Sequence, residues 1–289
     1  MNITGKTKIC GLIGDPVEHT MSPAMHNAAF EELGLDYVYL PFRVGAGELK
    51  NAVTGLKALN VRGFNVTIPH KISIVPMLDE IDAIAGKIGA VNTVVNEGGR
   101  LTGYNTDAAG FLRALLEKGV DPGGKNIVIL GAGGASRAIS FIMADSGAKL
   151  TVLNRKEELD WAVELARHIR EDLGTDARAL ELTPDNLSGA MAKSDILVNA
   201  TSVGMMPHDD ASPVPAGLLG PGLTVFDIVY NPVRTKLLRA AAEAGAGIID
   251  GVDMLAWQGA MAFEKWTGRQ APVQLMRDRA LRMLEKYEN

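Results

Sequence analysis

The stretch Ile127-Val-Ile-Leu-Gly-Ala-Gly-Gly-Ala-Ser136 decides the fold, because an apolar run enters a glycine-rich turn and continues into helix-forming residues. This order predicts the strand, turn and helix of a dinucleotide-binding unit. Gly131 would permit the tight bend, and Gly133 would let a pyrophosphate approach the main chain at the helix N-terminus. Ser136 stands where the third glycine of this pattern is usual. Glycines also serve plain strand-to-helix turns, so the motif alone leaves that alternative open.

Around this turn, short apolar segments alternate with helical segments, which predicts an α/β fold built from βαβ units. In the second part of the chain, six strand candidates with helices between them match a doubly wound, dinucleotide-binding sheet. These candidates are Asn126–Leu130, Leu150–Leu153, Arg178–Leu182, Ile196–Asn199, Thr224–Val229 and Gly247–Ile249.

The first third of the chain predicts a second α/β unit, which ends before the turn-rich loop Gly119–Gly124. Its strands are expected at Lys8–Ile13, Tyr37–Phe42, Gly63–Val66 and Val91–Val95. Its helices are expected at Pro23–Leu33, Glu48–Leu59, Asp79–Ile84 and Asp107–Lys118.

Two helices, Asp253–Trp266 and Val273–Lys286, follow the last strand with no strand left to join, so we expect them to pack back on the first unit. We therefore predict two domains. Residues 1–106 with 267–289 would form a substrate-binding and catalytic domain, and residues 107–266 a Rossmann-type cofactor domain.

Composition narrows the function classes. The 289 residues carry 29 basic and 34 acidic side chains, a net charge of −5, without a basic tract, so we expect no nucleic-acid partner. The single cysteine, Cys10, excludes a disulfide within one chain and favours a cytoplasmic setting. We expect no membrane partner, because neither an apolar signal segment nor a long apolar run is present. The histidines lack metal-ligand spacing, so we assign no metal.

Asn154, Arg155 and Lys156 follow the second strand of the dinucleotide unit, where an NAD enzyme usually carries an acid for the ribose hydroxyls. Cations there suit a 2′-phosphate, so we predict NADP as the cofactor, with NAD as the alternative. Glu157 and Glu158 follow at once and would weaken this preference. A solvated charge cluster at a helix start is the other interpretation.

Three polar clusters of the first unit are hard to explain by packing. Thr20 and Ser22 place two hydroxyls beside a predicted helix N-terminus, where they would cap the helix or bind a carboxylate. Thr67 and Lys71 follow a strand on its C-terminal side, the edge at which open α/β sheets bind ligands. The alternative for Lys71 is an ordinary solvated charge.

The third cluster contains Asn92 and Asp107, at the edges of a predicted strand pair. Asp107 would either cap the helix that follows or belong to a site with the other polar residues.

Together these clusters, the glycine turn and two later motifs resemble the shikimate dehydrogenase family over nearly the whole chain. The later motifs are Asn199-Ala-Thr-Ser-Val-Gly204 and Gly251-Val-Asp-Met-Leu-Ala-Trp-Gln-Gly259, the second continuing to Gly268. The resemblance implies NADP-dependent interconversion of 3-dehydroshikimate and shikimate, in the route through chorismate to the aromatic amino acids.

Carried over residue by residue, the resemblance makes Lys71 and Asp107 the catalytic pair. Lys71 would exchange a proton with the substrate oxygen, and Asp107 would hold it by charge-assisted hydrogen bonds. The residues that match the family's substrate ligands are Thr20, Ser22, Thr67, Asn92, Tyr230 and Gln258. The residues that match its cofactor contacts are Gly131, Ala132, Gly133, Gly134, Ala135, Ser136, Asn154, Arg155, Lys156, Ile228 and Gly251.

Two departures from the family pattern leave alternatives open. Thr20 replaces a usual serine, which would crowd the carboxylate or tune the choice between shikimate and quinate, and Lys156 replaces a hydroxyl residue, which puts strict NADP preference in doubt. The alternatives are a quinate/shikimate dehydrogenase that uses NAD and a catalytically silent sensor that binds NAD(P) and shikimate. The sequence leaves the oligomeric state open, a homodimer included.

Overall fold

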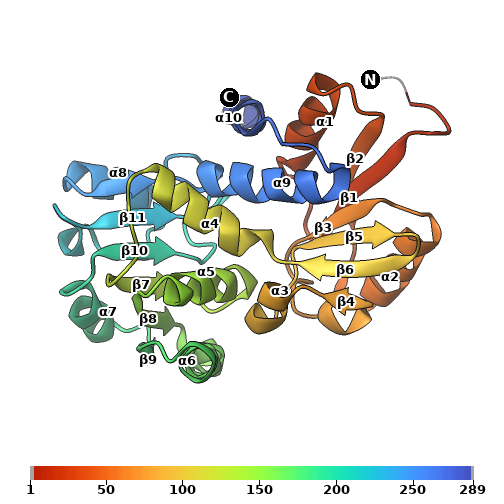
Figure 1. The fold of residues 1–289 in the computed structure, drawn as a ribbon. Coiled ribbons are helices and arrows are strands. Elements are labelled where there is room, and N and C mark those ends of the chain that lie inside the picture. The colour runs from red at the N-terminus through yellow and green to blue at the C-terminus, as the bar shows by residue number, and fades with distance from the viewer. Residues whose placement is uncertain (1–2, 288–289) are drawn as a thin grey trace. The chain divides into compact units, whose positions relative to one another are not determined.

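The computed structural model describes residues 3–287, so the predicted domain limits at residues 1 and 289 lie outside the described residues. The chain forms two compact units (Figure 1), the first from residues 3–110 and 256–287 and the second from Phe111–Leu255. The chain passes from one unit to the other within helices α4 (Thr106–Glu117) and α9 (Gly251–Thr267). Each unit contains a sheet of its own, which confirms the predicted α/β fold.

The first unit is built on a mixed sheet. Its strands are β1 (Lys8–Gly14), β2 (Tyr37–Arg43), β3 (Gly63–Val66), β4 (Glu80–Ile81), β5 (Thr93–Glu97) and β6 (Arg100–Tyr104), in the order β2-β1-β3-β5-β6-β4. β1 is parallel to β2 and β3, whereas β5 is antiparallel to β3 and β6 (Figure 1). The end of β3, the start of β5 and the end of β6 therefore meet at one edge of the sheet.

The helix predicted at Asp79–Ile84 is wrong. Glu80 pairs with Thr102 as part of the short strand β4, and the helix α3 (Ala83–Ile88) begins only afterwards. Asp82 caps this helix, because its Oδ2 accepts a hydrogen bond from Ile84 N at 3.1 Å. The helix therefore begins at Ala83, four residues after the predicted start at Asp79.

The C-terminal helices return to the first unit, as predicted. The other helices of this unit are α1 (Ser22–Glu32), α2 (Leu49–Ala58) and α10 (Val273–Tyr287), and α10 packs on α1. The buried Trp266 of α9 donates from Nε1 to Val94 O at 3.0 Å. Gly63 makes room for this ring, because an added Cβ would lie 2.2 Å from the indole nitrogen.

The second unit is built on an all-parallel sheet in which the six predicted strands are confirmed to within two residues. They are β7 (Asn126–Leu130), β8 (Lys149–Asn154), β9 (Ala177–Glu181), β10 (Ile196–Asn199), β11 (Thr224–Asp227) and β12 (Gly247–Ile249), in the order β12-β11-β10-β7-β8-β9. Its other helices are α5 (Gly134–Asp145), α6 (Leu159–Leu173), α7 (Pro184–Met191) and α8 (Lys236–Glu243). This strand order reverses between β7 and β10, as in a doubly wound fold.

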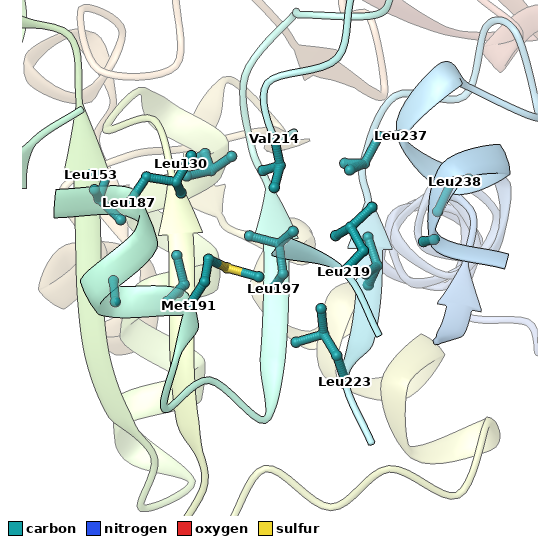
Figure 2. Packing of buried hydrophobic residues seen from close by; sticks show 14 residues of the cluster. Leu130, Leu153, Leu187, Met191, Leu197, Val214, Leu219, Leu223, Leu237 and Leu238 are labelled. Atoms are coloured by element: carbon teal, nitrogen blue, oxygen red, sulfur yellow. The ribbon is translucent and has the colours of Figure 1, made fainter. Parts of the chain in front are cut away.

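A leucine-rich core covers one face of the parallel sheet. Figure 2 shows Leu197 of β10 beside Met191 of α7, with Leu237 and Leu238 of α8 on the same side. Burying one such side chain stabilises the fold by about 1.5–3 kcal/mol. Within residues 3–287, the helices are too short or too polar to cross a lipid bilayer.

Candidate functional site

One edge of the mixed sheet collects polar side chains from three strand ends. The turn after β3 carries Thr67 and Lys71, Asn92 directly precedes β5, and Asp107 lies in the first turn of α4, just after β6. Asn92 N donates to Tyr104 O at 3.0 Å, so the start of β5 is tied to the end of β6. Residues distant in the sequence are thereby brought to one place.

Lys71 and Asp107 form a largely buried ion pair. Lys71 Nζ lies 2.6 Å from Asp107 Oδ2, and the two side chains are only 15% and 7% exposed. Lys71 is therefore not an ordinary solvated charge. The side chain that caps α4 is Asn105 and not Asp107, because Asn105 Oδ1 accepts a hydrogen bond from Ala108 N at 3.2 Å. An ammonium held in this way can give a proton to a substrate oxygen that becomes negative, and take it back in the reverse direction.

The amide of Asn92 is held in one orientation beside this pair. Its Oδ1 accepts from Thr106 N at 2.7 Å, and its Nδ2 donates to Asp107 Oδ1 at 2.8 Å. Gln258 Oε1 lies 3.4 Å from the same nitrogen, although Gln258 is 166 residues away in the sequence. The structure thus brings four of the predicted site residues together: Lys71, Asn92, Asp107 and Gln258.

The hydroxyls of Thr20 and Ser22 bind each other at the start of α1. Thr20 Oγ1 donates to Ser22 Oγ at 3.2 Å and accepts from Ser22 N at 3.3 Å. The N-cap of α1 is Met21, without a capping side chain, so of the two alternatives for Ser22 the helix cap is not observed. Two adjacent hydroxyls at a helix N-terminus are suited to an anion such as a carboxylate.

Sequence reasoning missed three buried polar residues near this edge: Tyr39, Asn65 and Thr93. Tyr39 Oη donates to Asn65 Oδ1 at 2.7 Å, and Asn65 Nδ2 donates to Thr93 Oγ1 at 3.1 Å. Asparagine is unusual in a strand interior, so Asn65 within the four-residue strand β3 was a readable signal. Tyrosine and threonine are ordinary strand residues and gave no such signal.

The glycine turn of the second unit has the geometry of a phosphate-binding loop. Gly131 follows β7 with φ of 96°, and an added Cβ would lie 3.0 Å from Ala200 O. Gly133 is the N-cap of α5 and has open space where a Cβ would stand. Ser136 is fully buried and donates from Oγ to Gly131 O at 2.6 Å, which explains a serine in place of the third glycine.

A dinucleotide fits this loop on two further observations. The first turn of α5 directs backbone N–H groups toward the space above Gly133, as an anion requires. Arg137, in the same turn, has a buried Nε that finds no hydrogen-bond partner among the described residues. A bound anionic group would supply such a partner.

The segment after β8 carries the predicted ribose-phosphate residues. Asn154 Nδ2 donates to Glu158 O at 2.8 Å, which fixes the turn Lys156–Glu158. Arg155 is exposed and pairs with the carboxylate of Glu158. Arg155, which is predicted to bind the 2′-phosphate of NADP, is therefore already paired with a carboxylate in this structure.

Ile228 and Gly251 lie directly against each other in the second unit. Gly251 opens α9, and an added Cβ would lie 2.4 Å from Ile228 O, so a side chain does not fit there. Tyr230 follows in the loop after β11, and burial raises the pKa of its phenol above the usual value. This phenol therefore stays protonated and available as a hydrogen-bond donor.

Asp227, at the end of β11, anchors two loops and was not singled out from the sequence. It accepts hydrogen bonds from Thr235 Oγ1 at 2.7 Å, Asn199 Nδ2 at 2.9 Å and Val229 N at 3.1 Å. The bond from Val229 turns the chain and ends β11 two residues before the predicted limit. Burial raises the pKa of this carboxyl to about 6.

Metal-binding geometry is not found in the described part of the chain. Groups of three or more histidine, cysteine or acidic side chains that could hold an ion do not occur among those residues.

Comparisons with known proteins identify one family. The family model for the shikimate dehydrogenase substrate binding domain matches residues 12–94, and that for the shikimate 5'-dehydrogenase C-terminal domain matches residues 251–281. The shikimate dehydrogenase (NADP(+)) of Methanopyrus kandleri is 50% identical over 287 residues, which is 98% of either chain.

Two solved structures extend this similarity to the fold. The shikimate 5-dehydrogenase of Listeria monocytogenes, in complex with shikimate and NAD, is 44% identical, with a TM-score of 0.90 over 96% of this chain and 98% of that one. The enzyme of Thermus thermophilus, in complex with NADP(H) and shikimate, is 39% identical, with a TM-score of 0.85 over 96% and 99%.

Proposed function

The chain belongs to the shikimate dehydrogenase family, and we propose that it catalyses the reversible, NADP-dependent reduction of 3-dehydroshikimate to shikimate. The observation that carries this proposal is the buried ion pair of Lys71 and Asp107 beside Asn92. A reduction of a ketone needs one proton donor next to the reacting oxygen, and this pair supplies one.

In the proposed mechanism the protein donates the proton in the reduction and accepts it in the oxidation. NADPH, when bound, supplies the hydride to the carbonyl carbon. Lys71 Nζ gives a proton to the carbonyl oxygen as negative charge develops there, and it receives the proton from the hydroxyl in the oxidation. Asp107 holds the lysine at 2.6 Å, and Asn92 fixes the other oxygen of that carboxylate at 2.8 Å.

We propose that the substrate carboxylate binds the hydroxyls of Thr20 and Ser22. Their position at the N-terminus of α1 supports this role, because the helix end also favours negative charge. Thr67, Tyr230 and Gln258, together with Asn92, are proposed as hydrogen-bond partners of the substrate. Ring hydroxyls need such donors and acceptors for orientation.

We propose that the dinucleotide binds the turn from Gly131 to Ser136. Asn154, Arg155 and Lys156 would bind the adenosine ribose and its 2′-phosphate, and Ile228 with Gly251 would flank the nicotinamide. The open space at Gly133 supports the first assignment, and the exposed guanidinium of Arg155 supports the second. We also propose a reducing, cytoplasmic setting, which the single, buried Cys10 supports.

Initial rates in four mixtures test the proposed function. Shikimate or quinate is combined with NADP or NAD, and the reduced-nicotinamide absorbance is followed. We expect rapid turnover with shikimate and NADP. Turnover with quinate and NAD would instead support a quinate/shikimate dehydrogenase, the second candidate, which the pairing of Arg155 with Glu158 favours. Saturable binding of shikimate without turnover in any mixture would contradict both and indicate a sensor.

A further inference from the structure

A continuous chain of hydrogen bonds links Tyr39 of β2 to the ion pair at the sheet edge. Its members all belong to the first unit, and all are less than one-tenth exposed: Tyr39, Asn65, Thr93, Asn92 and Asp107. A buried polar network holds a defined geometry when each member has its partners. The chain ends at the carboxylate that holds Lys71, the residue proposed for proton transfer.

Tyr39 sets the direction of the chain. Its Oη donates to Asn65 Oδ1 at 2.7 Å. Burial raises the pKa of this phenol well above its usual value, so the donor proton stays in place. The ring is fixed by stacking on His26, with ring centroids 4.4 Å apart and planes inclined by 14°.

The donor direction is passed on at each step. Because Asn65 Oδ1 faces the phenol, its Nδ2 donates to Asn92 O at 3.2 Å and to Thr93 Oγ1 at 3.1 Å. Thr93 Oγ1 therefore keeps its own proton for Asn92 Oδ1, which lies 3.0 Å away. With Oδ1 used as an acceptor, Asn92 Nδ2 faces Asp107 Oδ1 at 2.8 Å.

We propose that Tyr39 is a positioning residue for the reaction, because its hydroxyl fixes the carboxylate of Asp107 through the hydrogen-bond chain. The inference rests on the proposed function, since it takes Lys71, which Asp107 holds, as the proton donor. The side chain of Tyr39 is 1% exposed, so it acts through these neighbours and not on the substrate itself.

Tyr37, two residues earlier on β2, offers a matched control. Its ring is also buried and stacks on Phe30 with centroids 5.1 Å apart. Its Oη donates to Trp266 O at 3.4 Å, which lies outside the chain described above. Tyr37→Phe and Tyr39→Phe each remove one hydroxyl and keep a buried ring, so the two variants carry a similar packing change.

The first experiment compares the kinetics of these two variants. We expect Tyr39→Phe to lower kcat by about tenfold, the size expected for one lost hydrogen bond, and to leave the KM for shikimate within about twofold of wild type. Tyr37→Phe should keep both constants within about twofold of wild type. The KM for NADP should stay unchanged in both variants, and thermal unfolding should shift by similar amounts.

Two double-mutant cycles test whether the effect runs through the chain. In a Thr93→Val background, Tyr39→Phe should no longer lower kcat, because the chain is already broken. In a Ser22→Ala background, it should still lower kcat by the same factor, because Ser22 is not a member of the chain. Thr93→Ser keeps the hydroxyl and should retain the wild-type kcat, which shows that the hydroxyl, and not the methyl group, is required.

Each failure has a distinct signature. No turnover of shikimate by the wild-type protein would refute the proposed function. Wild-type turnover with equal kinetics for Tyr39→Phe and Tyr37→Phe would refute the positioning role alone. Strict additivity of Tyr39→Phe and Thr93→Val would also overturn it, because it would show that the hydroxyl does not act on Asp107 through the chain.

Discussion

At the edge of the mixed sheet, β3, β5 and β6 deliver charged and amide side chains that bind one another, whereas β7 of the parallel sheet delivers Gly131, Gly133 and a helix N-terminus. Lys71 and Asp107 can move a proton, and backbone N–H groups can hold an anion. Under the proposed function, chemistry and cofactor binding therefore depend on different parts of the chain. Substitutions in the first unit should therefore change turnover, and those in the second unit cofactor affinity or stability.

The two units also bury an ionisable group in opposite ways. His26 of the first unit is buried against aromatic rings, and both of its ring nitrogens are without a hydrogen-bond partner among the described residues. Burial lowers the pKa of this imidazole to about 3. Asp227 of the second unit has three hydrogen-bond donors, yet burial raises the pKa of its carboxyl to about 6. The histidine is kept neutral by packing, and the carboxylate is kept charged at neutral pH by its donors.

The largest expected effect is a loss of turnover in the first unit. Asp107→Asn keeps the size of the side chain but removes the charge that holds Lys71, so kcat should fall by about 10²–10³-fold. Initial rates at saturating shikimate and NADP measure this effect. Asp121→Asn, in an exposed loop, is the control and should stay near wild type. If Asp107→Asn lowered NADP affinity as much as it lowers kcat, this would contradict the assignment of turnover to the first unit and cofactor binding to the second.

A change in the pH dependence of stability is expected from the second unit. Between pH 4 and 6 the folded state binds a proton at Asp227 that the unfolded state has released, so this group lowers the free energy of unfolding as pH rises. Asp227→Asn removes that contribution. The free energy of unfolding of the variant, minus that of wild type, should therefore rise by up to about 3 kcal/mol from pH 4 to pH 7. Urea unfolding at both pH values measures it, and a constant difference would contradict the elevated pKa.

The opposite slope is expected from His26 in the first unit. Its pKa is lower in the folded state, so its contribution to stability is present above about pH 6.5 and is lost as pH falls toward 3. In Asp227→Asn the contribution of His26 to the pH dependence of stability remains, but the opposing contribution of Asp227 is absent. The variant should therefore lose stability on acidification more steeply than wild type over this range.

A weaker substrate affinity is the next effect in size. Ser22→Ala removes one of the two hydroxyls proposed for the carboxylate, so the KM for shikimate should rise about tenfold with a smaller change in kcat. Ser73→Ala, on an exposed position of the same unit, is the control. An unchanged KM would refute the assignment of the carboxylate to Ser22.

The smallest effect concerns the choice of cofactor. Glu158→Gln frees the guanidinium of Arg155, so NADP should bind about three- to fivefold more tightly while NAD binding stays constant. Calorimetric titration with adenosine 2′,5′-bisphosphate measures the phosphate contact apart from turnover. Glu157→Gln is the matched control. Equal gains for both cofactors would show that Arg155 does not bind the 2′-phosphate.

The sequence predicted most of the fold because strands with apolar runs are local features. Asn126–Leu130 and Gly63–Val66 agree with the structure at both ends. The segment Asp79–Ile84 failed because Asp82 caps a later helix and Glu80 pairs with a strand that lies 22 residues on. Such pairing depends on residues that a local pattern does not contain.

The candidate site divides in the same way. Gly131 and Ser136 were readable from a short motif, and the hydrogen bond between them spans only five residues. Tyr39 binds Asn65 across 26 residues, and Asn92 meets Gln258 across 166, so neither contact follows from sequence spacing. The alternative of a cap by Ser22 is not observed, because α1 already begins at Ser22 and its N-cap position is Met21.

Lys71→Ala tests most directly the claim that the first unit carries the chemistry. Turnover and the binding of shikimate and NADP are measured on the same preparation. We expect kcat to fall by about 10²–10⁴-fold, while both dissociation constants stay close to wild type. Near-normal turnover would contradict it, because the proton would then come from a group other than Lys71.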